Sequence, residues 1–184
     1  MPTPSPSGGG EPPRTGLRDE LSELVRADLA VNPFLADRAV LLVWRLGQVA
    51  HGRPGLLAFA LRRLHTLLDV VVVRTYAGAE LPRSTSAGPG LRLPHSGRGV
   101  VLHPSSRLGR DVVLYHRVTL GVRGGSAAPV VEDGVYLGCG AAVLGDVRVG
   151  SGASVGANAV VLADVPSGDR AVGVPARLLG RKPA

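Results

Sequence analysis

Aliphatic residues recur at every sixth position along the second half of the chain. They form two blocks, from Leu102 to Leu120 and from Val131 to Val161, and a glycine often follows directly, as at Gly138. A period of six fits neither the 3.6-residue turn of an α-helix nor the two-residue alternation of a β-strand. It is typical of the hexapeptide parallel β-helix, in which three short strands joined by tight turns form each coil.

The six-residue spacing is interrupted twice. The same phase is already present at Leu81 and Leu93, so the coil is predicted to begin near Glu80. Leu93 is nine residues from Leu102, which leaves three extra residues within 95–99, and five extra residues lie within 122–130. Insertions in a solenoid map to loops on one face and often form the binding site. We therefore expect the chemistry at these two loops.

Apolar positions in the first half of the chain follow helical spacing instead. They predict three helices, over about residues 17–30, 36–50 and 54–74, with a break at Asn32-Pro33. The segment before them is rich in proline, glycine and serine, which predicts a disordered tail. The expected organisation is a tail at 1–16, a helical region at 17–75, a β-helix domain at 76–166 and a C-terminal tail at 167–184.

Composition narrows the class of protein. Hydrophobic residues make up 45% of the chain but aromatic residues only 3%, which suits a narrow core of valine, leucine and alanine. The net charge is +7, yet no basic stripe with stacking aromatics indicates nucleic-acid binding. The charge would instead attract an anionic cofactor. With one cysteine, no apolar run long enough for a membrane span and no signal-peptide pattern, we expect a soluble cytoplasmic protein.

His95 is the first candidate for catalysis because it lies in the first interruption. A histidine held at a coil corner can remove a proton from a hydroxyl that attacks an electrophile. An acid on its other ring nitrogen would orient it, and Glu80 is the candidate. The alternative from spacing alone is that His95 is a turn residue and Glu80 a solvated charge.

A metal site is the second possibility. His95, His103 and His116 all lie on the coil, and left-handed-coil carbonic anhydrases hold zinc with three histidines. Their pattern places two histidines five residues apart, whereas the gaps here are eight and thirteen. We therefore expect no metal, and a non-catalytic scaffold is the third hypothesis.

Four stretches together resemble the serine acetyltransferases, which are left-handed β-helix acyltransferases with a helical N-terminal region. The resemblance extends over about Tyr76 to Gly180. The stretches are Leu91-Arg92-Leu93-Pro94-His95, Gly99-Val100-Val101, Leu114-Tyr115-His116-Arg117-Val118-Thr119-Leu120-Gly121 and Gly173-Val174-Pro175-Ala176-Arg177.

The resemblance implies direct transfer of an acetyl group from acetyl-CoA to serine, as in cysteine biosynthesis. His95 matches the catalytic base and Glu80 the acid that orients it. The resemblance also implies a homotrimer with active sites between neighbouring coils, or a hexamer made of two trimers. Residues matching the CoA-binding positions are Gly121, Ala141 and Ala159, whose backbone lines the pantetheine groove, and Arg177 near the nucleotide.

The chain departs from the family at two places. Pro94 stands where many members have an acid, and Ala127-Ala128 stands where many have an Arg-His pair that contacts the acceptor carboxylate. Arg98 and Arg123 are the candidates to bind the acceptor instead. The predicted function is serine O-acetyltransferase, and the alternative is an acyltransferase of the same fold acting on another small hydroxyl or amine, such as a sugar or a specialised-metabolite precursor.

Overall fold

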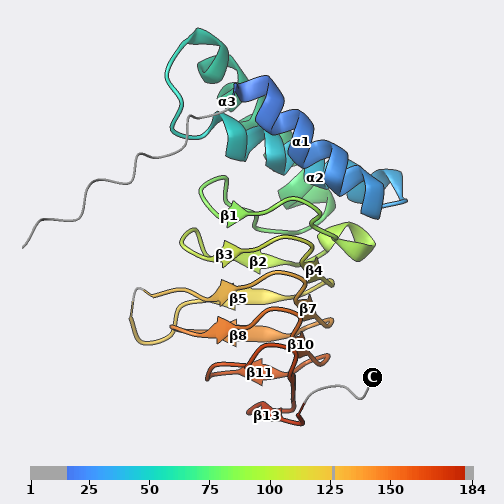
Figure 1. Ribbon diagram of the computed structural model, residues 1–184. Coiled ribbons are helices and arrows are strands. Elements are labelled where there is room, and N and C mark those ends of the chain that lie inside the picture. The colour runs from blue at the N-terminus through green and yellow to red at the C-terminus, as the bar shows by residue number, and fades with distance from the viewer. Residues whose placement is uncertain (1–15, 126, 181–184) are drawn as a thin grey trace, which may run out of the picture.

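The computed structural model describes residues 16–125 and 127–180 of the chain. A group of helices covers one end of a coil of short strands, and the described chain ends near the opposite end of that coil (Figure 1). The predicted disordered tail lies outside the described residues except for Gly16, and so do the last four residues of the predicted C-terminal tail.

The helical region contains three α-helices and a π-helical segment that continues the third. The first two helices match the predicted ranges within one residue, whereas the third passes into wider π geometry at Asp69. Four consecutive valines begin at Val70, and β-branched side chains are crowded in a regular helix. None of the described helices is long and apolar enough to cross a membrane. The bounds are α1 (Leu17–Val31), α2 (Leu35–Ala50), α3 (Leu56–Leu68) and η1 (Asp69–Tyr76).

The coil has three faces, each a sheet of short strands, and the chain visits faces 1, 2 and 3 in turn (Figure 1). All strand pairs are parallel except the last, β12 with β13. Face 1 contains β2 (Val101–Leu102), β5 (Thr119–Gly121), β8 (Ala142–Leu144) and β11 (Val160–Val161). Face 2 contains β1 (Ser86–Ala87), β3 (Arg107–Leu108), β6 (Val130–Val131) and β9 (Arg148–Val149). Face 3 contains β4 (Val113–Leu114), β7 (Tyr136–Leu137), β10 (Ser154–Val155), β12 (Arg170–Val172) and β13 (Arg177–Leu178).

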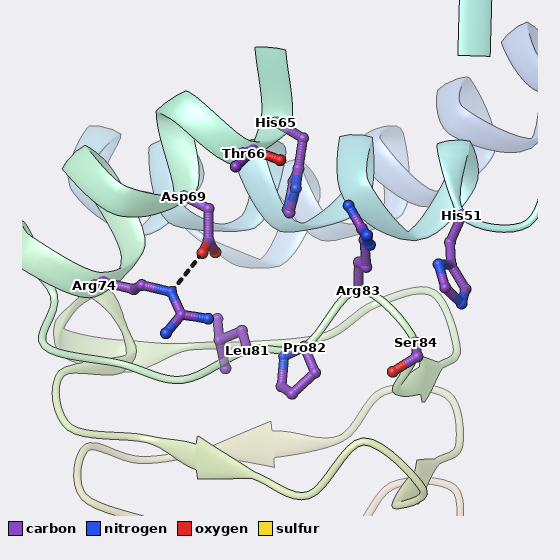
Figure 2. Close-up of a pocket in the computed structure, with 9 residues that line it drawn as sticks. All are labelled: His51, His65, Thr66, Asp69, Arg74, Leu81, Pro82, Arg83 and Ser84. Atoms are coloured by element: carbon purple, nitrogen blue, oxygen red, sulfur yellow. Dashed lines mark hydrogen bonds and ion pairs between the residues drawn. The ribbon is translucent and has the colours of Figure 1, made fainter. Parts of the chain in front are cut away.

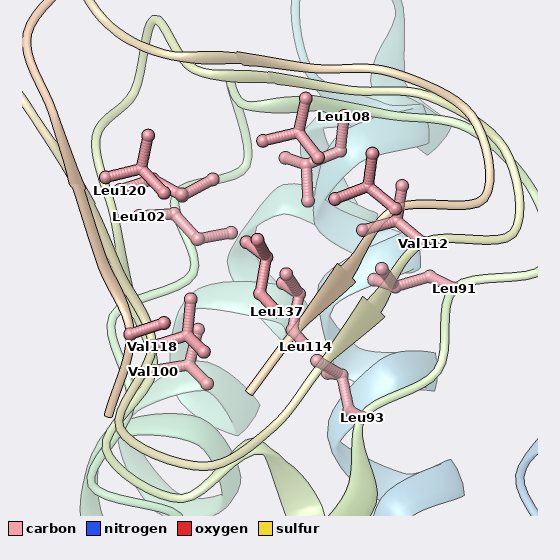
Figure 3. Packing of buried hydrophobic residues seen from close by; sticks show 14 of the residues in the cluster. Leu91, Leu93, Val100, Leu102, Leu108, Val112, Leu114, Val118, Leu120 and Leu137 are labelled. Atoms are coloured by element: carbon pink, nitrogen blue, oxygen red, sulfur yellow. The ribbon is translucent and has the colours of Figure 1, made fainter. Parts of the chain in front are cut away.

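The six-residue repeat gives the core of the coil. On face 1, Leu102 pairs with Leu120, which pairs with Val143, which pairs with Val161. Each of these side chains is buried, and equivalent residues of the other faces meet them inside the coil (Figure 3). The predicted phase is therefore confirmed, because each inward position stacks on its copy one turn away.

The ladder continues one turn beyond Pro166, where the sequence indicates the end of the regular coil. β12 pairs in parallel with β10, and Ala171 takes an inward, buried position. The chain then reverses, so that β13 runs antiparallel to β12 and closes this end of face 3.

At the opposite end, helical side chains satisfy the open backbone edge of the first coil turn. The Trp44 indole donates to the Pro82 carbonyl at 3.0 Å, and the Arg45 guanidinium donates to the Ala87 and Gly88 carbonyls. Arg45 is fully buried and forms an ion pair with Asp28 at 2.7 Å. Unpaired strand edges otherwise bind other chains, and here the helices cover the edge.

Candidate active site

His95 lies in a tight turn, η2 (Pro94–Gly97), where the chain passes from face 3 to face 1. This is the first interruption of the repeat. His95 and Ser96 have φ of 61° and 62°, the left-handed region that L-residues with side chains rarely adopt. Such a conformation costs on the order of 1–3 kcal/mol per residue, so neighbouring groups must hold it.

The helical region supplies the groups that hold this turn. Asp37 of α2 is buried, and its Oδ1 accepts hydrogen bonds from the Ser96 amide at 2.7 Å and the Ser96 hydroxyl at 3.2 Å. Asn32 bonds to the Leu91 carbonyl and the Leu93 amide just before the turn. The position of His95 therefore depends on residues from outside the coil.

A cavity of about 380 Å³ opens beside His95, between the start of α2 and the coil. Three titratable residues line it: His95, Asp37 and Arg92. Within the described residues, neither Oδ2 of Asp37 nor the Arg92 guanidinium has a hydrogen bond. The remaining lining residues are Pro33, Phe34, Ala36 and Pro94. A histidine, an aspartate and an arginine therefore line a partly apolar space.

Two further rings lie beside His95 on the coil side, and a third lies beside one of these. The His116 ring meets it edge to face at 5.1 Å between centroids, and the Tyr115 ring lies 6.1 Å away. Tyr136 contacts Tyr115 one turn further, and burial, with the neighbouring Tyr115 hydroxyl, raises the pKa of Tyr136. Nδ1 of His116 is buried without a hydrogen-bond partner in the described structure.

Glu80 lies on face 1, one turn above Val101, and is exposed. Its backbone pairs with the coil, with the amide donating to the Val100 carbonyl at 2.8 Å. No hydrogen bond or ion pair joins the Glu80 carboxylate to His95 among the residues described. The orienting role of Glu80 stays a prediction.

Three of the residues predicted to bind CoA, Gly121, Ala141 and Ala159, lie along face 1 or at its corner, whereas Arg177 lies on face 3. Ala141 and Ala159 occupy the same corner on successive turns, and their buried methyl groups leave only backbone for a ligand. Gly121 ends β5, where a Cβ would press on Leu144, and Arg177 is exposed in β13 at the far end. Their part in CoA binding stays a prediction.

Neither of the two arginines predicted to bind the acceptor lines the cavity at His95. The Arg98 guanidinium lies over the Tyr76 ring at 5.3 Å, and Arg123 lies in the second insertion, against Gly145. Arg92 is the arginine that does line this cavity.

The three histidines considered for zinc are not gathered together. His116 lies beside His95, but His103 follows β2 at a different corner, where its Nδ1 accepts from the Ser105 amide. Within residues 16–125 and 127–180, no three His, Cys, Asp or Glu side chains are arranged to hold a metal ion.

Comparison with known proteins decides the family. Residues 128–163 match the bacterial transferase hexapeptide (six repeats) family. A serine acetyltransferase of Helicobacter pylori strain J99 is 39% identical over 142 residues, which cover 76% of this chain and 78% of that protein. A soybean serine acetyltransferase complexed with serine has a TM-score of 0.69 at 32% identity, covering 89% of this chain and 69% of that one. A serine acetyltransferase complexed with CoA has a TM-score of 0.68 at 26% identity, with the same two coverages.

The chain belongs to the serine acetyltransferase family.

Membership of the serine acetyltransferase family confirms the predicted transferase class and the left-handed β-helix. Two residues that line the cavity at His95, Arg92 and Asp37, were not predicted from the sequence. Arg92 lies within the stretch that carries the resemblance, where alternation with Leu91 and Leu93 could have marked it as outward-facing. Asp37 had no such signal, because it reaches the turn from a helix 59 residues before Ser96.

Proposed function

We propose that this serine acetyltransferase family member transfers the acetyl group of acetyl-CoA to the hydroxyl of L-serine. The observation that carries the proposal is the cavity at His95, which a histidine, an aspartate and an arginine line together. The relatives that were solved with serine and with CoA support these two substrates.

His95 acts as the general base. Its imidazole removes the proton from the serine hydroxyl as the oxygen attacks the thioester carbonyl carbon. The tetrahedral intermediate collapses, the carbon–sulfur bond breaks, and the proton passes to the leaving thiolate of CoA. Backbone N–H groups near the turn stabilise the oxyanion. Glu80 orients the His95 ring. The two side chains come into contact when substrate is bound, because catalytic hydrogen bonds tighten in the substrate complex.

The cavity explains how an amino acid is bound without the family's Arg-His pair. Arg92 binds the serine carboxylate, since a guanidinium matches a carboxylate with two parallel hydrogen bonds. Asp37 keeps Oδ1 on the Ser96 turn and offers Oδ2 to the serine ammonium. Asp37 thereby supplies a carboxylate next to Pro94, where many members have an acid in the sequence itself. Arg98 and Arg123 stay as predicted contributors from outside this cavity.

The donor lies along face 1. Acetyl-CoA extends over Gly121, Ala141 and Ala159, where small residues leave the backbone accessible, and Arg177 pairs with a phosphate of the nucleotide. The protein is a homotrimer in which a neighbouring coil completes the groove, and a hexamer of two trimers is the alternative assembly.

Acceptor selectivity tests the proposal, with ethanolamine as the comparison because it is serine without the carboxylate. Wild-type protein should release CoA faster with serine than with ethanolamine. Arg92→Gln should lower the ratio of the two kcat/KM values about tenfold or more, which is the value of a charge-assisted hydrogen bond. Arg110→Gln removes the same charge from an exposed position elsewhere on the coil and should leave the ratio unchanged.

A ratio that is the same in Arg92→Gln and wild type would contradict the role of Arg92. Release of CoA with a sugar or another small alcohol or amine, and none with serine, would favour the alternative acceptor. The alternative rests on the two departures from the family pattern, at Pro94 and at Ala127-Ala128.

A further inference from the structure

A second cavity, of about 470 Å³, lies between the helical region and the first coil turn. Figure 2 shows its walls: α3 and η1 on one side and the coil segment 81–84 on the other. This segment connects Glu80 on face 1 with β1 on face 2, whereas His95 follows face 3. The two cavities are therefore at different corners of the coil, and a ligand in one leaves the other open.

Among the charged residues that line this cavity, one cation has no ion-pair partner in the described structure. Arg74 donates through Nε to Oδ2 of Asp69 at 2.7 Å, so these two charges offset each other. The Arg83 guanidinium has no hydrogen bond or ion pair with any described residue. Arg83 points toward the helices beside His65, and the Ser84 hydroxyl lies next along the chain (Figure 2).

His65 forms the buried wall of the cavity and is only 5% exposed. It packs against α2 at Gly47, where a Cβ would overlap the imidazole. Both ring nitrogens are buried without a hydrogen-bond partner in the described structure. Burial lowers the pKa of His65; Asp69 opposes this, and Arg83 and Arg74 add to it. Burial therefore favours the neutral form of the His65 ring.

We propose that this cavity binds a small oxyanion, a carboxylate or a phosphate, with Arg83 as its charge partner and the Ser84 hydroxyl as a donor. Both ligands accept hydrogen bonds from a guanidinium in the same planar arrangement. A monoanion matches the single uncompensated cation. His65 does not carry charge to the ligand; it is the buried neighbour whose titration reports the ligand's presence. This site is independent of the serine and CoA sites proposed above.

The test uses the full chain with ¹³C,¹⁵N-labelled histidine and follows the His65 ring signal by NMR. Sodium acetate and sodium phosphate are titrated separately at constant ionic strength, with sodium chloride as the salt control. We expect a saturable shift of the His65 signal and an upward shift of its pKa, because a nearby anion favours the imidazolium. Chloride should give no saturable change. Saturation by acetate alone identifies a carboxylate ligand, and saturation by phosphate alone identifies a phosphate ligand.

Arg83→Gln should weaken the binding about tenfold or more, the effect of losing a charge-assisted hydrogen bond. The residue is exposed, so the variant should fold. Arg110→Gln is the matched control and should bind as the wild type does. Equal binding in Arg83→Gln and wild type, or a change that is linear with every salt including chloride, would overturn the proposal.

Discussion

The coil and the helical region are stabilised by different kinds of contact. In the coil, aliphatic side chains stack on copies of themselves, and the backbone bonds to the backbone one turn away. In the helical region, buried side chains such as Asn32, Asp37 and Arg45 form hydrogen bonds to specific groups of the first coil turn. Most of the buried polar residues of the described chain belong to it: Asp28, Asn32, Asp37, Arg45, His65 and Asp69.

This difference bears on catalysis because the proposed base lies at the boundary. His95 is part of the coil by sequence, but its left-handed turn is held by Asp37 of α2. The coil holds single left-handed residues elsewhere, such as Arg117 and Asn158, but the consecutive pair His95 and Ser96 is also bonded to a helix through Asp37. Damage to the helical region should therefore lower catalytic activity as well as the free energy of unfolding.

The largest effect should come from Arg45→Leu. The substitution leaves the Asp28 carboxylate buried without its charge partner and removes donors from the Ala87 and Gly88 carbonyls. Breaking a buried ion pair on one side costs about 3–5 kcal/mol. The free energy of unfolding, measured by urea titration, should fall by this amount.

Two controls make the Arg45 result specific. Arg26→Leu changes an exposed arginine on α1 and should alter the free energy of unfolding by less than about 0.5 kcal/mol. Leu137→Met conserves volume in the coil core and should cost less than about 1.5 kcal/mol. An Arg45→Leu variant as stable as either control would refute the contrast between the two regions.

A middle-sized effect is expected at Gly47. In Gly47→Ala the new methyl group overlaps the buried His65 ring, and overpacking of this kind costs about 1–3 kcal/mol. In a His65→Ala background the methyl has room, and the same change should stabilise α2 by up to about 1 kcal/mol, because alanine favours a helix. Urea titration of wild type, the two single variants and the double variant measures the change in the free energy of unfolding in each background. A change in the free energy of unfolding of the same sign in both backgrounds would contradict this explanation. Gly125→Ala, in open space, is the neutral control.

The smallest effect should be on the coil surface, at Glu132. Hydrogen bonds from the Ser151 hydroxyl and amide, and the Arg148 guanidinium, lower the pKa of Glu132 in the folded protein. Its contribution is therefore present above the unfolded pKa of about 4.3 and is lost as pH falls through the folded value. Glu132→Gln should have a slightly lower urea midpoint than wild type at pH 7, with the gap closing as the solution is acidified. A difference in urea midpoint that does not change with pH would contradict this role of the Glu132 carboxylate.

The same contrast explains what could be predicted from the sequence. The coil was predictable because each turn repeats one environment, so Leu102, Leu120 and Val143 give the same signal at a fixed spacing. The three helices were predictable from apolar spacing, but their contacts with the coil were not. Asp28 bonds to Leu91, and Asn32 to Leu93, across 63 and 61 residues. Such pairs depend on how a helix packs against the coil, and a local sequence pattern does not predict that packing.

At the site, the interruption of the repeat located His95, and the stretch around it carried the family resemblance. The positions of Asp37 and Arg83 came only from the structure, since each lies at the junction between helices and coil. The proposed Glu80–His95 pair rests on the resemblance, and no hydrogen bond or ion pair joins the two side chains in the described residues.

The most direct test of the central claim is serine-dependent release of CoA from acetyl-CoA, measured for wild type and His95→Ala at matched thermal stability. The wild type should release CoA when serine is added. His95→Ala should lose about 10²–10⁴ in kcat, the contribution of a positioned general base. Equal kcat in the two proteins would contradict the assignment of His95 as the base.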